Sequence, residues 1–386
     1  MSDQDLIPES QVEVYRELQQ HLHTLPVGYP ATKSGVELRL LKRVFTPEEA
    51  KIASHMKFSW DNLESLDSIY ERVKELGFTK EELGNNLDNM VKKGAIMTKR
   101  REGKNLYSLA LFMVGIFEFQ VNKLTKEYVE DIHQYMNEAF MMEAGSTQIG
   151  QLRVIPVEES LTPTLNIANY DDLSTILESI EGPFASINCV CRQAMELIGK
   201  PCKATSRMDV CMGWGDFAQL YIDEGWAKEV SKDEVLEILK KNQEDGLIIQ
   251  PGNAQKPEFI CSCCSCCCEG LQRIKMLPNP VDFITSNHFA VVDPDLCDGC
   301  ETCVEICQMD AITMTDGTSL VNKQRCIGCG NCVAKCPSEA LTLQKKEQVI
   351  IPPETEAELY NTIWDRKKVL LEREQKRQLR KEKRMK

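Results

Sequence analysis

The chain has 386 residues, of which 42% are hydrophobic and 27% are charged, and this composition excludes extensive intrinsic disorder. Because single hydrophobic cores rarely grow beyond about 250–300 residues, we expect two or three domains. The formal net charge of −13 argues against general electrostatic binding to nucleic acid or to anionic lipid. The longest apolar stretch, residues 109–117, is much shorter than the roughly 20 residues that cross a bilayer, so no membrane span is expected.

The N-terminus begins with the acidic and polar sequence MSDQDLIPES, which lacks the basic and apolar regions of a secretory signal. We therefore expect a cytoplasmic protein. Eighteen cysteines are many for a chain of this length. In a reducing compartment they are better explained as metal ligands than as disulfides, because thiol buffers keep cysteines reduced.

The first part of the chain is predicted to form an N-terminal segment (1–30), with a short helix and a loop, and a domain at 31–120. Thr46 and Thr79 are each followed by acidic residues in the pattern of a helix N-cap. Apolar spacing and turn residues predict a further helix at 66–76 and two strands at 95–99 and 105–112.

Three helices followed by a hairpin with a basic tip resemble the winged helix-turn-helix family over residues 46–112. The resemblance implies that residues 79–93 form the recognition helix. Basic side chains lie at its end and on the hairpin, namely Lys92, Lys93, Lys99, Arg100, Arg101 and Lys104. However, Glu81, Glu82 and Asp88 would repel phosphate, so we expect a structural or protein-docking role, with DNA binding as the alternative.

The rest of the chain is predicted to have four parts. Residues 121–160 form a helix (127–142) and a linker. A cysteine-rich helical domain follows at 161–290, with helices expected at 171–180, 186–198, 216–224 and 231–245. Residues 291–348 contain a short repeat, and 349–386 form a basic C-terminal helix that carries 11 Lys and Arg and 4 Asp and Glu from Asp365 onward. The overall fold class is therefore expected to be α+β.

The repeat consists of residues 297–312 and 326–341, which align without a gap. Each half has four cysteines in the pattern C-x2-C-x2-C-x3-C, with glycines in the loops that allow the backbone to curl tightly. The cysteines of the first half are Cys297, Cys300, Cys303 and Cys307, and those of the second are Cys326, Cys329, Cys332 and Cys336. A zinc site does not use three cysteines at equal short intervals, so the pattern favours iron–sulfur ligation.

Residues 288–346 resemble the bacterial-type two-[4Fe-4S] (dicluster) ferredoxin domain. The resemblance implies two [4Fe-4S] clusters with crossed ligands. One cluster would take Cys297, Cys300, Cys303 and Cys336, and the other Cys326, Cys329, Cys332 and Cys307. The chain departs from the family at Gln308, because the family usually has proline after the last cysteine of each half.

Ten further cysteines precede the repeat: Cys189, Cys191, Cys202, Cys211, Cys261, Cys263, Cys264, Cys266, Cys267 and Cys268. No packing argument requires six thiols within residues 261–268, so we expect metal ligation. One or two further [4Fe-4S] clusters are the favoured interpretation, and zinc or redox-active thiols are the alternatives. Arg192 and Arg207 could donate hydrogen bonds to a cluster, although surface ion pairs are the simpler explanation. We interpret His133 and His288 as structural because neither has a second histidine at ligand spacing.

These patterns predict an iron–sulfur protein that carries single electrons between a donor and an acceptor protein. Two other functions stay open: a redox-sensing winged-helix regulator, and an oxidoreductase subunit with an active site at residues 261–268. No nucleotide-binding, serine-hydrolase or zinc-protease motif is present in the sequence. The cysteine-rich region also resembles a segment that precedes dicluster modules in some ferredoxin-like proteins of anaerobic metabolism.

Overall fold

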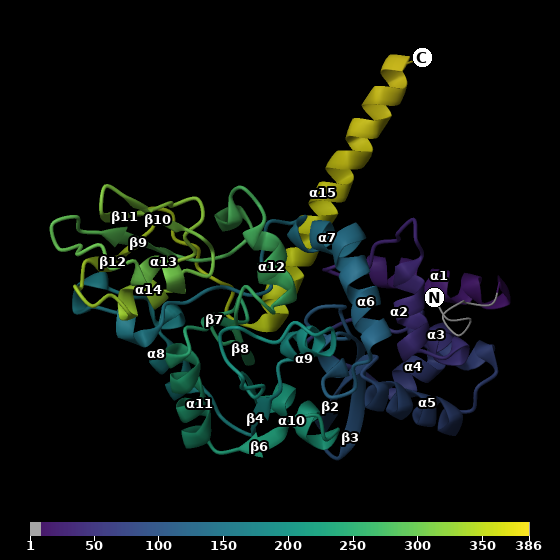
Figure 1. Ribbon diagram of the computed structural model, residues 1–386. Helices are drawn as coiled ribbons and strands as arrows, with labels where there is room; N and C mark the ends of the chain where they lie inside the picture. Colours follow the sequence, from purple (N-terminus) through teal and green to yellow (C-terminus); the bar gives the residue numbers. More distant parts are fainter. Residues whose placement is uncertain (1–8, 386) are drawn as a thin grey trace. The chain divides into compact units, whose positions relative to one another are not determined.

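The computed structural model describes residues 9–385, which form two compact units (Figure 1). The first unit comprises the described residues of Met1–Gln120, Glu130–Ile149 and Ala357–Lys386, and the second comprises Val121–Val129 and Gly150–Glu356. Both units contain helices and antiparallel sheets, so the expected α+β composition is confirmed. No helix in the described part of the chain has the length and apolar character of a membrane span.

The described part of the first unit begins with five helices and a small sheet, of which the sequence predicts four helices and the two longer strands but neither the helix Val36–Val44 nor the short strand Glu64–Ser65. Thr46 and Thr79 each form a complete capping box, in which the hydroxyl accepts from the N3 backbone and the N3 glutamate accepts from the N-cap backbone. The three-stranded sheet has the order β1-β3-β2. The elements are α1 (Glu9–His23), α2 (Val36–Val44), α3 (Pro47–Ala53), β1 (Glu64–Ser65), α4 (Leu66–Val73), α5 (Lys80–Lys93), β2 (Ile96–Arg101) and β3 (Lys104–Leu109).

The core of the first unit contains a cluster of aromatic rings and one face of the C-terminal helix. Tyr29, Phe112 and Tyr135 lie with ring centroids 4.8–5.5 Å apart. Tyr360 stacks on Trp60 at 5.1 Å. The helices that follow the sheet are α6 (Lys126–Tyr135), a π-helical turn η4 (Met136–Phe140), α7 (Met141–Gly145) and the long helix α15 (Glu356–Met385).

Helix α15 is the helix that the sequence predicts at the C-terminus, but one face of its first half is apolar and buried. Leu359, Tyr360 and Ile363 are buried, whereas its described basic residues beyond Lys367 are exposed. The Lys367 ammonium is also buried, where it donates to Glu143 Oε1 at 2.7 Å and to two backbone carbonyls. The first half of the helix is thus part of the core, and its second half is the basic segment.

The middle of the second unit corrects the expectation of a helical cysteine-rich domain. It contains a five-stranded antiparallel sheet of order β6-β4-β5-β8-β7 together with its helices. The strands are β4 (Phe184–Ile187), β5 (Cys211–Trp214), β6 (Lys228–Val230), β7 (Ile248–Pro251) and β8 (Phe259–Cys263). Each strand is five residues or shorter, and two of them contain cysteines instead of alternating β-branched residues, so their sequences carry little strand signal.

Five helices in the described residues of this domain accompany the sheet, and the sequence predicts the first four of them but not the one at Glu269–Lys275. Ile176 and Leu177 of one helix and Val235 and Leu239 of another pack against Ile249 and other sheet residues. The Ser231 capping box starts the second of these helices. The helices are α8 (Leu173–Ser179), α9 (Val190–Leu197), α10 (Gly215–Asp223), α11 (Lys232–Glu244) and α12 (Glu269–Lys275). Short 3-10 turns are η2 (Lys74–Leu76), η3 (Glu118–Gln120), η5 (Glu158–Ser160), η6 (Pro163–Leu165), η7 (Asn169–Asp171) and η8 (Pro280–Asp282).

The C-terminal repeat forms two similar layers around a core rich in cysteine. β9 (His288–Val292) pairs with β12 (Leu341–Lys345), and β10 (Ile312–Thr315) pairs with β11 (Thr318–Val321), both antiparallel. A short helix contains the third cysteine of each half, α13 (Thr302–Ile306) with Cys303 and α14 (Asn331–Ala334) with Cys332. Apolar residues including Ile312, Ile327 and Leu341 form the core together with the cysteine side chains.

Candidate metal centres

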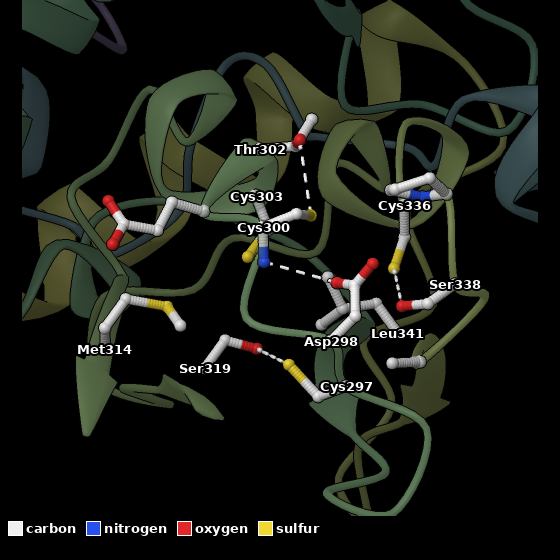
Figure 2. Close-up of a pocket in the computed structure, with 13 residues that line it drawn as sticks. Cys297, Asp298, Cys300, Thr302, Cys303, Met314, Ser319, Cys336, Ser338 and Leu341 are labelled. Atoms are coloured by element: carbon white, nitrogen blue, oxygen red, sulfur yellow. Dashed lines mark hydrogen bonds between the residues drawn. The ribbon is translucent and has the colours of Figure 1, made fainter. Parts of the chain in front are cut away.

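The first candidate centre is a cavity of about 280 Å³ in the C-terminal repeat (Figure 2). Its four cysteines are Cys297, Cys300, Cys303 and Cys336. Hydroxyl groups surround their sulfurs: Ser319 Oγ lies 3.7 Å from Cys297 Sγ, and Ser338 Oγ lies 3.6 Å from Cys336 Sγ. The hydrogen bonds from Ser319 and from the backbone lower the pKa of Cys297. These hydrogen bonds favour the thiolate, the form that binds metal, at Cys297, whereas burial raises the pKa of Cys303 in the same cavity.

The second candidate centre is a separate cavity of about 390 Å³ in the same repeat. Its four cysteines are Cys307, Cys326, Cys329 and Cys332. Backbone N–H groups of Ala290 and Ala311 donate to the sulfurs of Cys326 and Cys307 at 3.3 and 3.2 Å. Burial raises the pKa of the Cys329 thiol to about 12, so an ionised sulfur here needs a compensating cation.

Each cavity has three cysteines from one half of the repeat and the fourth from the other half. The chain approaches these cavities through tight loops. Gly299, Gly328 and Gly330 have φ values of +73°, +67° and +80°, in the left-handed region that favours glycine. A Cβ at Gly328 would also collide with the backbone carbonyl of His288. The glycines therefore allow the curled backbone that the sequence predicts.

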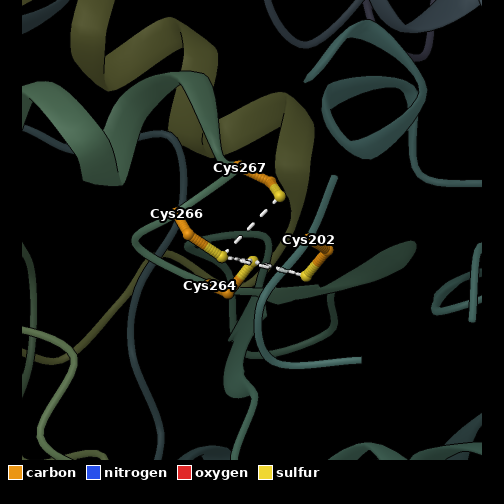
Figure 3. Close-up of side chains that lie close together, drawn as sticks. All are labelled: Cys202, Cys264, Cys266 and Cys267. Atoms are coloured by element: carbon orange, nitrogen blue, oxygen red, sulfur yellow. Dashed lines mark hydrogen bonds between the residues drawn. The ribbon is translucent and has the colours of Figure 1, made fainter. Parts of the chain in front are cut away.

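Four of the ten upstream cysteines gather in a compact group, which we call the tetrad: Cys202, Cys264, Cys266 and Cys267 (Figure 3). Their Sγ atoms all lie within 4.8 Å of one another. The shortest separations are 3.4 Å between Cys264 and Cys266 and 3.5 Å between Cys202 and Cys264. The hydrogen bond from the Cys267 thiol, aided by the charge of Arg192, lowers the pKa of Cys264 to about 6. At least one sulfur of the tetrad is thus readily ionised.

The other six upstream cysteines form a closed ring, which we call the hexad: Cys189, Cys191, Cys268, Cys263, Cys261 and Cys211. In this order each thiol lies within hydrogen-bonding reach of the next, and the last reaches the first. Cys261 and Cys263 lie on one face of β8, because alternate residues of a strand point the same way. The register that pairs Met212 with Ile260 puts Cys211 opposite Cys261.

Arg192 and Arg207, the two arginines that the sequence analysis considered, have different surroundings. Arg192 is buried, and its guanidinium donates to the Ser262 carbonyl at 3.1 Å and to Cys264 Sγ at 3.6 Å. Its place is therefore beside the tetrad and not in a surface ion pair. Arg207 does form an ion pair, with Asp245 at 2.7 Å.

Gln308 has contacts that the sequence does not predict. Gln308, which stands where the family has proline, accepts from the Ser265 backbone at 2.7 Å and donates to the Gly246 carbonyl at 2.5 Å. It also lines the second cavity, so it connects that cavity to the cysteine-rich loop.

His288 is buried on β9, and His133 lies on α6. Neither histidine belongs to a compact group of metal-ligating side chains among the described residues.

Comparison with known proteins identifies one region. Residues 289–337 match the family model of the 4Fe-4S dicluster domain. Neither a curated protein nor a solved structure matches the chain. The matched region contains all eight cysteines of the repeat, so the chain contains an iron–sulfur domain of this kind.

Proposed function

We propose that the protein carries single electrons between redox partner proteins through two [4Fe-4S] clusters with crossed ligands. Cys297, Cys300, Cys303 and Cys336 would hold one cluster, and Cys326, Cys329, Cys332 and Cys307 the other. The observation that carries the proposal is the presence of two cavities, each lined by four cysteines with three from one half of the repeat and one from the other. When bound, such clusters supply reversible one-electron chemistry.

The donor set of these cavities fits iron–sulfur clusters. Both contain four thiols and no histidine or lysine side chain among their lining residues. Backbone N–H groups and hydroxyls point at the sulfurs, and such hydrogen bonds stabilise negative charge on a thiolate-ligated cluster. The role of the protein is therefore to fix the ligands, to limit water and to set the reduction potential.

Electrons would enter or leave through the first cavity. Cys300 is exposed, whereas Cys326 and Cys332 of the second cavity are buried. Acidic side chains surround the exposed loop, namely Asp293, Asp295, Asp298, Glu301 and Glu305. A partner with a basic docking surface fits this face, because complementary charge accelerates encounter and orients the two proteins.

The middle domain would extend the electron path. We assign the hexad to a further iron–sulfur cluster because its thiols form a ring and all come from segments close to the sheet strands β5 and β8. Gln308, which lines the second cavity, forms hydrogen bonds with Ser265 of the cysteine-rich loop and with Gly246, and so links the middle domain to that cavity. An electron could then pass from the hexad through the second cluster to the first.

For the region that resembles a winged helix, we propose protein docking instead of DNA binding. Helix α5 and the hairpin β2–β3 supply the expected elements, but several of the basic side chains are already paired. Lys93 donates to both carboxylate oxygens of Glu49 at 2.7 Å, and Lys99 lies 3.6 Å from Asp61. Such neutralised charges contribute little to phosphate binding.

The test is a redox titration of the anaerobically purified chain, followed by visible absorption and electron paramagnetic resonance. The proposal predicts reversible one-electron reduction at two or more centres and rapid transfer to an added one-electron acceptor. A chain that binds iron but cannot be reduced reversibly would contradict it. Specific, salt-dependent binding to a defined DNA sequence would instead favour the regulator.

A further inference from the structure

The tetrad differs from the other cysteine groups of the described residues because all four of its sulfurs lie within 4.8 Å of one another. Four of the Sγ–Sγ separations run from 3.4 to 3.8 Å, with Cys202–Cys266 at 3.8 Å and Cys266–Cys267 at 3.7 Å. These distances are too long for a disulfide, in which the sulfurs are about 2.05 Å apart. The distances match the spacing of four sulfurs around one tetrahedral metal ion. Four sulfurs at about 2.3 Å from one tetrahedral zinc ion are about 3.8 Å apart.

An iron–sulfur cubane requires wider spacing, because each thiolate binds a different iron atom at a corner of the cluster. The repeat gives the comparison within the same chain. Its eight cysteines line cavities of about 280 and 390 Å³, and no three of them gather within the range that the tetrad occupies in the described residues. The chain therefore spaces its thiols differently at the two kinds of site.

The tetrad offers a complete set of four ligands, of which two are buried, while Cys202 and Cys266 are partly exposed. Cys264 and Cys267 are each 1% exposed, and four sulfurs satisfy the coordination of a structural tetrahedral ion without an open position. The hexad uses none of these four thiols among its neighbours in the ring. Within residues 261–268, consecutive cysteines such as Cys267 and Cys268 thus belong to different groups.

The surroundings of the tetrad compensate the negative charge of a tetrathiolate site. An ion with two positive charges and four thiolates leaves a net charge of −2. The buried Arg192 guanidinium lies 3.6 Å from Cys264 Sγ and supplies a positive charge. The Lys203 backbone N–H donates to Cys266 Sγ at 3.5 Å. Such contacts around the ligands stabilise metal–thiolate sites.

We propose that Cys202, Cys264, Cys266 and Cys267 bind a single zinc ion that is separate from the iron–sulfur clusters. Cys202 comes from residues 198–210, which form neither helix nor strand, and the other three come from the loop after β8. The ion fastens these two segments together. Its role is structural: it holds the 198–210 segment, including the Lys203 backbone donor, against the cysteine-rich loop.

The experiment measures zinc, iron and acid-labile sulfide per chain in the full-length protein, purified without oxygen and with zinc in the medium. The wild type is expected to contain about one zinc ion. Cys202→Ala and Cys266→Ala are expected to lose that zinc while iron and sulfide stay at the wild-type level. Ser265→Ala lies in the same loop and leaves all four thiols intact, so it serves as the matched control and keeps the zinc.

Two further measurements test the zinc site even if the alanine variants fold poorly. Cys202→His retains a zinc-binding set of three cysteines and one histidine, so it is expected to keep the ion. Cobalt exchanged into the wild type should give the absorption bands of a tetrahedral thiolate site, and these bands should change in Cys202→His. A zinc-free wild type, or a parallel loss of iron and sulfide in the Cys202 and Cys266 variants, would overturn the proposal. Loss of iron from the repeat cysteines would not affect it, so this test is independent of the proposed electron transfer.

Discussion

Cys297 and Cys336 line the same cavity although they belong to opposite halves of the repeat. Cys307 of the first half lies in the other cavity, with three cysteines of the second half. The two halves are therefore joined at both sites, and the small core between them consists largely of cysteine and a few aliphatic residues. A module of this size whose core consists largely of cysteine is expected to depend on bound metal for its stability.

Removal of the metal should therefore unfold the repeat while the first unit stays folded. Hydrogen exchange would measure this directly. After chelation, the amides of β9–β12 should lose most of their protection, because the cavities lose the groups that fill them. The amides of α5 serve as the internal control and should change little. Equal protection of the strands with and without metal would show that the repeat folds around its aliphatic core alone.

Ser319 should tune the potential of the first cluster. Its hydroxyl lies 3.7 Å from Cys297 Sγ and stabilises negative charge on that sulfur. Ser319→Ala should therefore make the reduction potential of one cluster more negative. The shift should be on the order of tens of millivolts, since about 59 mV corresponds to a tenfold change for one electron.

Thr318→Ala is the matched control for this measurement, because neighbouring residues of β11 point to opposite faces of the strand. It should leave both potentials unchanged in the same electron paramagnetic resonance titration. A shift of equal size in both variants, or none in Ser319→Ala, would argue against a hydrogen bond to a cluster ligand.

Gln308 should couple the second cluster to the middle domain. Gln308→Pro introduces the residue that the family usually has, and it removes the hydrogen bonds to Ser265 and Gly246. We expect the iron content to stay the same and electron transfer between the middle domain and the repeat to slow at least several-fold. Stopped-flow reduction measures this rate.

Asn331→Ala is the control: it removes a separate donor to the Gly246 carbonyl at 2.8 Å and so tests whether any disturbance at Gly246 has the same effect. Unchanged kinetics in Gln308→Pro would contradict the proposed path.

Glu356 should make stability fall as the pH rises. Burial, followed by the nearby charge of Glu258, raises its pKa to about 8. At pH values between the pKa of this carboxyl in the unfolded state, about 4.3, and its pKa in the folded state, the unfolded chain binds fewer protons than the folded chain. The free energy of unfolding therefore falls by as much as about 1.4 kcal/mol per pH unit across this window.

Glu356→Gln removes this titration, so the variant should melt close to the wild type at pH 5 and at a higher temperature at pH 8. Comparing the two proteins at each pH cancels the contribution of the clusters. Glu354→Gln is the control, because Glu354 is exposed and paired with Lys256, and its pKa is lowered instead. A difference between Glu356→Gln and wild type that does not grow with pH would exclude a raised pKa at this carboxyl.

Local signals in the sequence predicted much of the fold. Thr46, Thr79 and Ser231 start helices because a hydroxyl N-cap and a glutamate at N3 interact within one turn. The regular cysteine spacing of the repeat indicated the dicluster domain that the family model matches. In both cases the residues that determine the structure are close together in the chain.

The middle domain was harder to predict because its organisation depends on distant residues. The strands β5 and β8 are short, and their pairing brings Cys211 opposite Cys261. Whether a cysteine joins the tetrad or the hexad depends on this pairing and on where β8 ends, since Cys263 lies in the strand and Cys264 follows it. Spacing alone does not contain this information, so the sequence left the number and type of sites open.

The crossed arrangement of the two clusters is tested most directly by counting iron and sulfide in paired alanine variants. Cys297→Ala should remove one cluster, or about four iron atoms per chain. Adding Cys336→Ala should remove no more, because both thiols serve the same cluster, whereas adding Cys307→Ala should remove about four more. The reverse pattern, with the greater loss in the Cys297 and Cys336 pair, would contradict the account.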